Sequence, residues 1–188
     1  MRIIAGNFKG KKIFLPKDNN TRPLRDYVKE SIFNIIEHSK HINFRLENSK
    51  VLDLFSGVGS FGLECISRGA AKVTFFEKYS KALMILKKNI NFLKCSNKVQ
   101  IVENDIFKFV KIHNLNNQKY DLIFLDPPFN ETNVEKLLNV IFQNKILRRE
   151  SVIILHRNKK TVDKLPCEFK IFIQKNYGIS KIIFGRFI

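Results

Sequence analysis

Two kinds of hydrophobic pattern alternate along this chain. Short, nearly continuous apolar runs are typical of strands buried on both faces of a sheet, whereas apolar residues three and four positions apart are typical of helices that bury one side. The runs predict strands at 50–55, 72–77, 98–104, 120–125 and 151–156, with a closing antiparallel pair at 168–176 and 180–187. The helical spacing predicts helices at 59–70, 80–94, 105–113 and 131–142, the first of them stopped by Gly69.

This order of elements defines the fold class. Strands that alternate with helices predict an α/β fold with a mostly parallel sheet and with helices on both of its faces. The seven predicted strands would form one doubly wound, Rossmann-like sheet, to which the closing pair adds an antiparallel edge. Open α/β sheets bind ligands at the carboxyl ends of their strands, so residues that directly follow a strand are the first candidates for a site.

Residues 1–48 differ in pattern from the rest of the chain. We expect them to form a small N-terminal extension ahead of the main domain at 49–188. The extension would contain a basic hairpin of two short strands, RIIAG and KKIFLP, around a glycine turn. A helix would follow from Asp26, a capping type of residue, to His38. Its buried side would carry Val28, Ile32, Ile35 and Ile36, and its solvent side Lys29, Glu30 and Glu37.

The composition limits the classes of protein to which the chain can belong. Its 188 residues, 44% of them hydrophobic, suffice for one main domain with a substantial core. Because no run approaches the ~18 apolar residues of a membrane helix and no signal peptide is evident, we expect a cytoplasmic protein without a membrane partner. We also expect a monomer. The three cysteines and four histidines show neither disulfide nor zinc-ligand spacing, so we expect no metal.

The net charge of +17, with a pI of about 9.9, changes this picture most. So basic a protein attracts polyanions and gains affinity from counterion release, which favours nucleic acid as a partner. The alternative is a lysine-rich surface whose charge is diffuse. Basic residues cluster at both ends of the chain, which favours a binding face. The N-terminal candidates for this face are Arg2, Lys9, Lys11 and Lys12.

A glycine-rich loop, DLFSGVGSFG at 53–62, follows the first strand of the main domain. Its G-x-G-x-x-G spacing lets the backbone turn sharply and approach a ligand closely. A tight turn that binds nothing is the alternative, but the position at the carboxyl end of a strand favours a ligand site. Glu77 ends the next strand, where an acid accepts hydrogen bonds from ribose hydroxyls, and Asp105 follows the third, near an adenine edge. Together these features predict an adenosine-containing cofactor.

Asp53 helps to distinguish between S-adenosylmethionine and NAD, the two cofactors that this pattern allows. Its carboxylate, just before the glycines, suits the ammonium group of a methionine tail better than the pyrophosphate of NAD. The chain is also too short for the second domain that is usual in a dehydrogenase. We therefore expect S-adenosylmethionine, with a dinucleotide as the alternative.

The fourth strand ends in Asp126-Pro127-Pro128-Phe129, beside the first strand in the usual order of such sheets. The prolines donate no hydrogen bond and fix the backbone, so the Asp126 carboxylate and the Pro127 carbonyl would be rigid, adjacent acceptors. Such a pair matches a planar amino group with two hydrogens, and Phe129 could stack on its ring. A strand terminator with a packing aromatic is the other interpretation. The motif predicts methyl transfer to the amino group of a base.

With these residues in view, the chain resembles the RsmD family of bacterial 16S ribosomal RNA guanine-N2 methyltransferases. The resemblance covers nearly the whole chain, in MRIIAGNFKGKK, TRPLRDYVKESIFNII, VLDLFSGVGSFGLECISRGA, FFEKYSKALMILKKNI, DLIFLDPPF and YGISKIIFGRF. The pattern D/N-P-P-F/Y also occurs in DNA adenine-N6 and protein glutamine methyltransferases. The elements R-I-I-x-G and T-R-P point to the RsmD type.

The resemblance implies a class I, S-adenosylmethionine-dependent methyltransferase that modifies one guanine of 16S ribosomal RNA in the small subunit or its assembly intermediate. Carried over by motif, the cofactor site would contain Asp53, Phe55, Gly57, Gly59, Glu77, Asp105 and Ile106, and the catalytic motif Asp126, Pro127, Pro128 and Phe129. Thr21, Arg22 and Arg25 would order over the site or contact RNA phosphate, although ordinary surface charge explains Arg25 equally well. The family commonly has an acid where this chain has His156, so the role of that residue is open.

Two alternative functions stay open at this point. A DNA adenine-N6 methyltransferase would share the motif that holds the amino group, but the chain lacks a sizeable insertion for target recognition. A non-catalytic RNA-binding assembly factor would need only the basic ends, and it leaves the glycine loop and the Asp-Pro-Pro-Phe motif unexplained.

Overall fold

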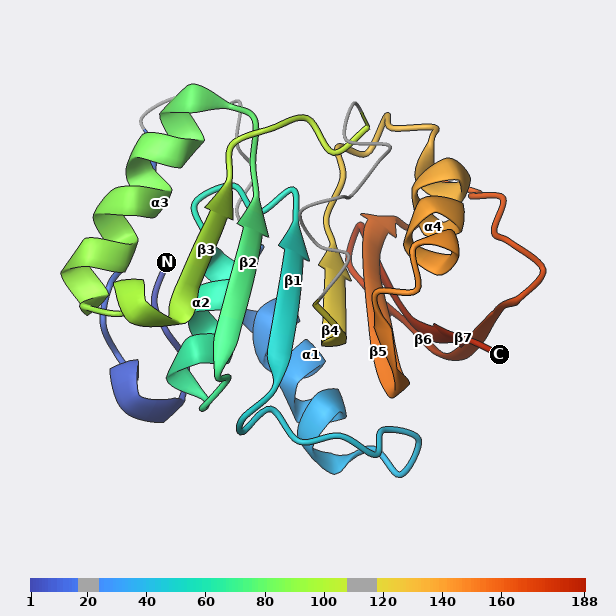
Figure 1. Cartoon of the computed structure of the whole chain (residues 1–188), viewed down its shortest axis with the longest axis horizontal. Helices are drawn as coiled ribbons and strands as arrows, with labels where there is room; N and C mark the ends of the chain where they lie inside the picture. The colour runs from blue at the N-terminus through green and yellow to red at the C-terminus, as the bar shows by residue number, and fades with distance from the viewer. Residues whose placement is uncertain (17–23, 108–117) are drawn as a thin grey trace.

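A sheet of seven strands forms the centre of the computed structural model, which describes residues 1–16, 24–107 and 118–188 (Figure 1). In chain order the elements are η1 (Gly6–Phe8), α1 (Asp26–His38), β1 (Lys50–Leu54), α2 (Ser60–Ser67), β2 (Lys72–Phe76), α3 (Ser80–Leu93), η2 (Ser96–Lys98), β3 (Val99–Val102), β4 (Tyr120–Leu125), α4 (Val134–Gln143), β5 (Leu147–Asn158), β6 (Phe169–Tyr177) and β7 (Ser180–Phe187). The predicted strands of the main domain are confirmed.

The strands lie in the order β3-β2-β1-β4-β5-β7-β6. Neighbours from β3 to β5 are parallel, whereas β7 runs antiparallel to both β5 and β6. The last strand of the chain is therefore an interior strand of the sheet. Leu54 at the end of β1 pairs with Leu125 at the end of β4, so the loops that follow these two strands begin side by side. This is the Rossmann-like fold that the sequence predicts.

Helices cover both faces of the sheet. One hydrophobic cluster joins α1, α2 and α3 to the face that carries Val51, Phe75 and Phe124. A second cluster joins α4 to the opposite face, which carries Leu52 and Ile123. Figure 1 shows α4 in front of the sheet and α1 and α2 behind it. Alternate residues of the strands thus enter different clusters, as the two-sided burial of the apolar runs requires.

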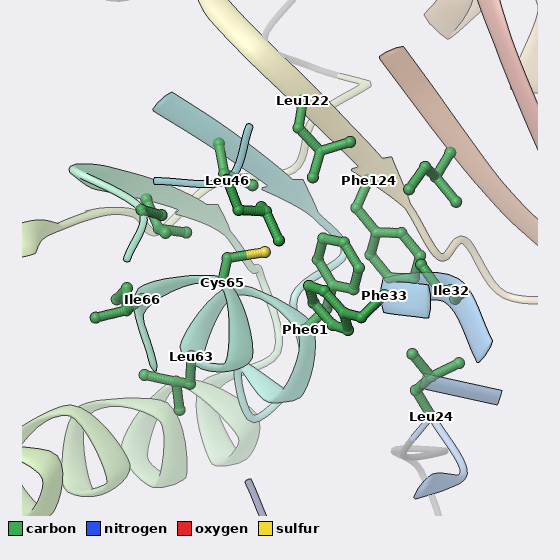
Figure 2. Close-up of a cluster of buried hydrophobic side chains, with 14 of the residues drawn as sticks. Leu24, Ile32, Phe33, Leu46, Phe61, Leu63, Cys65, Ile66, Leu122 and Phe124 are labelled. Carbon is green, nitrogen blue, oxygen red and sulfur yellow. The ribbon is translucent and has the colours of Figure 1, made fainter. Parts of the chain in front are cut away.

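Three aromatic rings connect the N-terminal part of the chain to the main domain. Figure 2 shows Phe33 of α1, Phe61 of α2 and Phe124 of β4 lying together in the core. The ring centroids of Phe61 and Phe124 are 3.9 Å apart, and those of Phe33 and Phe61 are 5.1 Å apart. Residues 1–48 therefore share a core with the main domain, and the boundary at residue 48 stays a prediction.

The N-terminal hairpin is less regular than the sequence predicts. The two expected strands reduce to one antiparallel bridge between Arg2 and Lys12, with η1 in the turn between them. The reason is that the first segment also binds α2: the Glu64 carboxylate accepts hydrogen bonds from the backbone N–H groups of Ile4 (2.8 Å) and Ala5 (2.9 Å). The prediction of two strands in this hairpin is wrong, although the chain does reverse here.

Lys29 is the second correction, because it is fully buried and not on the solvent side of α1. Its ammonium group donates to the carbonyl of Arg2 at 2.8 Å and lies 3.5 Å from the Glu64 carboxylate. Phe33, one turn further along α1, lies on the same buried side, so the apolar face is wider than the spacing of the isoleucines suggested.

Most element boundaries agree with the sequence, with three differences. α4 begins at Val134, three residues after the predicted start, and β5 extends on both sides of the predicted strand, to Leu147–Asn158. The helix predicted at 105–113 falls largely outside the described residues; Ile106 and Phe107 form a turn. α2 ends before Gly69, whose φ of +102° is favourable for glycine, as predicted. Among the described residues, no helix has the length and apolar character to cross a membrane.

Candidate active site

A cavity of about 660 Å³ opens at the carboxyl ends of the parallel strands. Such edges are where open α/β sheets bind their ligands. Residues of β1, β2, β4 and β5 and of the loops that follow β1, β2, β3 and β4 line it. Of the residues predicted for the cofactor and the catalytic motif, those that line the cavity are Asp53, Phe55, Gly57, Glu77, Asp105, Ile106, Asp126, Pro127, Pro128 and Phe129.

The loop after β1 uses its glycines for different purposes. Gly57 has a φ of +55°, and a Cβ atom there would meet nothing within 4 Å, so its backbone faces the cavity. A Cβ atom at Gly59 would lie 2.4 Å from Cδ1 of Leu86 on α3, and Gly59 does not line the cavity. Gly57 therefore allows close approach of a ligand, whereas Gly59 allows close packing of the loop.

Phe55 has an unusual backbone conformation at the start of this loop. Its φ of +62° is costly for a bulky side chain. Phe55 lines the cavity, and its ring centroid lies 5.8 Å from that of Phe107, which follows the end of β3. The strained turn thus brings an aromatic side chain to the cavity between the ends of β1 and β3.

Glu77 fixes the glycine loop to the end of β2. Its Oε2 accepts a hydrogen bond from the Gly57 N–H at 2.6 Å, and its Oε1 accepts from Lys78 N–H at 2.9 Å and Tyr79 N–H at 2.8 Å. Two carboxylate oxygens offer about four acceptor positions, so one position remains for a hydroxyl of a ligand. The carboxylate predicted to bind ribose is in place at the cavity and is held by the backbone.

Asp53 is buried next to the cavity with little compensation for its charge. It is only 1% exposed, and its Oδ2 accepts one hydrogen bond from the Gly62 N–H at 2.9 Å. Burial raises the pKa of Asp53 well above its usual value, the Gly62 N–H opposes this rise, and the nearby charges of Asp126 and Glu77 add to it. A positively charged group in the cavity would stabilise the ionised form.

Ser60 is a site residue that the sequence analysis missed. It is the first residue of α2, lines the cavity, and is 6% exposed. Its hydroxyl is buried and has no hydrogen-bond partner among the described residues. A buried hydroxyl without a partner is unfavourable unless a ligand satisfies it. Its position in the sequence could have identified it, because Ser60 lies in the glycine loop 53–62 at the start of a predicted helix, and helix N-termini bind anions.

Asp105 and Ile106 line the wall of the cavity that follows β3. The Asp105 carboxylate accepts a hydrogen bond from the Phe107 N–H at 3.0 Å and forms an ion pair with Lys78 at 3.0 Å. Ile106 is 6% exposed and belongs to the hydrophobic cluster on the α4 face. This wall therefore combines an apolar surface with a fixed carboxylate, as an adenine site would require.

The Asp126-Pro127-Pro128-Phe129 motif begins beside the glycine loop, and both line the cavity. The Asp126 N–H donates to the Leu54 carbonyl at 3.3 Å, which ties the motif to the end of β1. The Pro128 carbonyl accepts a hydrogen bond from the Glu131 N–H at 2.9 Å. Within the described part of the chain, nothing donates to the Pro127 carbonyl. The two acceptors that the sequence predicts are thus at the cavity.

Two consecutive residues of β5, His156 and Arg157, contact this motif and were not predicted to do so. Nδ1 of His156 lies 2.8 Å from Oδ1 of Asp126, and Nη1 of Arg157 donates to the Pro128 carbonyl at 2.9 Å. Both side chains are almost fully buried, with exposures of 5% and 1%. Sequence patterns alone do not reveal such contacts between segments about thirty residues apart.

The predicted RNA-binding residues do not all lie at the cavity. Arg2, Lys9, Lys11 and Lys12 are exposed, but η1 packs against Ser67 at the far end of α2, near the amino ends of the strands (Figure 1). The length of α2, about 10 Å at 1.5 Å per residue, separates η1 and the adjacent Lys9 from the cavity. Arg25 is exposed next to Leu24, which lines the cavity. Thr21 and Arg22 lie outside the described residues.

The structure offers no metal site among the residues it describes, where no cluster of three or more His, Cys, Asp or Glu side chains could hold an ion. The residues present instead fit S-adenosylmethionine. Gly57 gives access to the backbone, Asp53 offers a carboxylate to an ammonium group, and Ser60 offers a free hydroxyl at a helix N-terminus.

A Rossmann-like sheet of this strand order, with a glycine loop after its first strand and an Asp-Pro-Pro-Phe motif after its fourth, defines a class I methyltransferase. A family model described as "Conserved hypothetical protein 95" matches residues 1–186. The chain belongs to this family, the RsmD type that its motifs predict.

Relatives of known name agree with this assignment. The chain is 33% identical over 180 residues to ribosomal RNA small subunit methyltransferase D of Haemophilus influenzae, covering 95% of this chain and 90% of the relative. Its identity to the protein of the same name in Buchnera aphidicola subsp. Acyrthosiphon pisum is 35% over 173 residues, or 92% and 86% of the two chains.

Solved structures agree as well. The Escherichia coli protein yhhF, described as a candidate methyltransferase, has a TM-score of 0.83 at 26% identity, covering 100% of this chain and 97% of that one. The Haemophilus influenzae protein HI0767, described as a candidate methylase, has a TM-score of 0.75 at 32% identity, with coverage of 98% and 96%.

Proposed function

We propose that this protein transfers a methyl group from S-adenosylmethionine to the exocyclic N2 of one guanine in 16S ribosomal RNA, within the small subunit or an assembly intermediate. The observation that carries the proposal is that the glycine loop and the Asp126-Pro127-Pro128-Phe129 motif line one cavity. The names of the relatives, which specify small-subunit ribosomal RNA, support the choice of substrate.

The cofactor half of the cavity would hold each part of S-adenosylmethionine separately. Glu77 would accept hydrogen bonds from the ribose, and Asp105 and Ile106 would flank the adenine. Asp53 would face the ammonium group of the methionine tail, and Ser60 its carboxylate. When bound, the cofactor supplies an electrophilic methyl group on a sulfonium.

The substrate half would hold the guanine amino group. One N–H would donate to the Asp126 carboxylate and the other to the Pro127 carbonyl, which turns the nitrogen lone pair away from both acceptors and toward the methyl group. Positioning of this kind can supply a large part of a rate enhancement. Phe129 would contact the base, and extrusion of the guanine from folded RNA would bring it into the cavity.

The charge of the protein supports a polyanionic substrate, and the placement of the basic residues suggests its path. Arg25 lies beside the cavity, whereas Lys9 and Lys11 lie at the far end of α2. An RNA that contacts both must extend along the face covered by α2 and α3. A structured substrate such as a ribosomal subunit provides this length more readily than a short oligonucleotide.

Transfer of labelled methyl from S-adenosylmethionine tests the proposal. The acceptors are unmodified small subunits, naked ribosomal RNA and duplex DNA, followed by nucleoside analysis. We expect N2-methylguanosine in the subunit, and we expect Asp126→Ala to lower the rate by about 10²- to 10³-fold or more, as for loss of other positioned polar groups. Label in DNA adenine, or wild-type rates for Asp126→Ala, would contradict the proposal. Cofactor binding without transfer to any acceptor would favour an assembly factor.

A further inference from the structure

His156 lies at the carboxyl half of β5 with both ring nitrogens in hydrogen-bond contact. Nδ1 is 2.8 Å from Oδ1 of Asp126, and Nε2 is 2.8 Å from Oγ of Ser180 on the neighbouring strand β7. The Asp126 carboxylate retains partial access to solvent, whereas His156 and Ser180 are 5% and 4% exposed. The ring of Phe129 meets the imidazole edge to face, with centroids 5.5 Å apart.

These contacts select one tautomer of the neutral imidazole. An ionised carboxylate only accepts hydrogen bonds, so the proton between the two groups belongs to Nδ1 of His156. Nε2 is then an acceptor, and the Ser180 hydroxyl donates to it. The Asp126 carboxylate thus selects the tautomer, and Ser180, whose hydroxyl can donate to Nε2, gives the second ring nitrogen a partner.

Arg157, the next residue of β5, holds the motif at a second point. Its guanidinium donates to the carbonyls of Pro128 (2.9 Å) and Glu131 (2.6 Å) and forms an ion pair with Asp163 at 2.8 Å. Consecutive residues of a strand point to opposite faces. The end of β5 therefore contacts the motif through the carboxylate of Asp126 on one face and through the loop backbone on the other.

We propose that His156 is a positioning residue for methyl transfer, which rests on the function proposed above. By donating to Oδ1 of Asp126, it fixes the carboxylate plane and leaves Oδ2 as the acceptor for the amino group of the substrate. Ser180 supports this role by holding the other side of the ring through its contact with Nε2. The hydrogen bond also opposes the repulsion between Asp126 and the buried Asp53, which lie close enough for their charges to interact.

Steady-state methyl transfer by variants of the full chain tests the role in catalysis. His156→Ala removes the donor, and we expect kcat to fall by about 10- to 100-fold, the scale of a misplaced catalytic group. The KM for the subunit and the affinity for S-adenosylhomocysteine should change less than about threefold. His156→Asn places an amide N–H near the position of Nδ1 and should restore most of kcat. His38, exposed at the end of α1, offers a matched control in His38→Asn.

A double-mutant cycle shows whether His156 acts through Asp126. In an Asp126→Asn background, His156→Ala should cost far less than in the wild type, because the carboxylate that it orients is absent. Additive costs in the cycle, a wild-type kcat for His156→Ala, or equal defects in folded His156→Ala and His156→Asn would each overturn the proposal.

Nitrogen NMR of the imidazoles gives a readout that does not depend on activity, so it separates failure of this proposal from failure of the proposed function. We expect the His156 ring of the wild-type protein to be protonated at Nδ1 and not at Nε2 at neutral pH. An Nε2-protonated neutral ring in the wild type would overturn the proposal.

Discussion

Two buried carboxylates, one within α2 and one next to its first turn, show how differently the chain treats negative charge. Glu64, on α2, accepts two backbone N–H groups and contacts both Arg68 at 2.9 Å and Lys29 at 3.5 Å. Asp53, beneath the start of the same helix, accepts one N–H group and has two further carboxylates as its charged neighbours. Both side chains are almost fully buried, at 0% and 1% exposure.

The difference separates a structural charge from one that is available to a ligand. At Glu64 the chain itself supplies the cations and donors, and the result joins the N-terminal segment, α1 and α2. At Asp53 none of the described residues supplies a neighbouring positive charge, and within the same part of the chain the hydroxyl of Ser60 has no partner. A buried charge without compensation costs stability, so the free protein bears a cost that a cationic ligand can remove.

Loss of Lys29 should have the largest effect on stability. Lys29→Met leaves the Glu64 carboxylate and the Arg2 carbonyl without their ammonium partner, and breaking a buried pair from one side typically costs about 3 to 5 kcal/mol. Thermal unfolding should show a lower Tm by roughly 10 °C. Lys40→Met, at an exposed lysine just beyond α1, is the control. Equal Tm values for the two variants would show that the buried cluster is not structural.

Asp53→Asn should affect stability and cofactor affinity in opposite directions. The amide oxygen can still accept the Gly62 N–H, so the fold loses no partner, and removal of an uncompensated charge should raise the free energy of unfolding. Loss of a charged hydrogen bond to the ammonium group should weaken S-adenosylhomocysteine binding by about 1.5 to 3 kcal/mol, or roughly 10- to 100-fold. Calorimetry measures both. Unchanged affinity would exclude Asp53 from the ammonium site.

The raised pKa of Asp53 predicts the direction of pH effects. Because the folded-state pKa lies above the unfolded-state value, its contribution to stability is complete below the usual Asp pKa and is lost as pH rises through the folded-state pKa. The stability gain of Asp53→Asn should therefore grow with pH over this window. Cofactor affinity should rise with pH over the same window, since the ammonium group requires the ionised carboxylate. Titrations in buffers of different ionisation enthalpy should detect proton release on binding.

The serines at the two ends of α2 provide the smallest and most specific comparison. Ser67 accepts the Phe8 N–H at 2.9 Å and donates to the Ala5 carbonyl at 2.5 Å, so Ser67→Ala should lower stability by about 1 kcal/mol and leave cofactor affinity unchanged. Ser60→Ala should do the reverse: it should weaken cofactor binding by about 0.5 to 1.5 kcal/mol and leave the stability of the protein unchanged. The same pattern in both variants would contradict the assignment of Ser60 to the cavity.

The sequence predicts those site residues whose role follows from local position. Asp53, Gly57, Glu77 and Asp126 follow or end apolar runs, and the carboxyl ends of parallel strands must meet at one edge of the sheet. That single rule brings together residues more than seventy positions apart. The same rule places Gly59 in the loop after β1 but does not show whether it faces the cavity. Packing against α3 decides that, and it turns Gly59 away from the ligand side.

The residues that the sequence analysis missed act through distant partners. His156 ends the apolar run at 151–156 and Arg157 follows it, so the pattern allowed a place at the site but did not identify their partners, which are 30 and 29 positions away. Lys29 was assigned to solvent because it is charged, although Phe33 one turn later marks the buried side. A buried charge is recognisable only once its compensating groups are known.

The interior position of β7 has a consequence for synthesis of the protein. β7 follows both β5 and β6 in the chain, yet it must enter between them and bring Ser180 against His156. Until then β5 has an open edge, and His156, which contacts Asp126, lacks its contact with Ser180. A nascent chain from which β7 has not yet emerged can therefore form the glycine loop while the proposed methyl-acceptor site is incomplete.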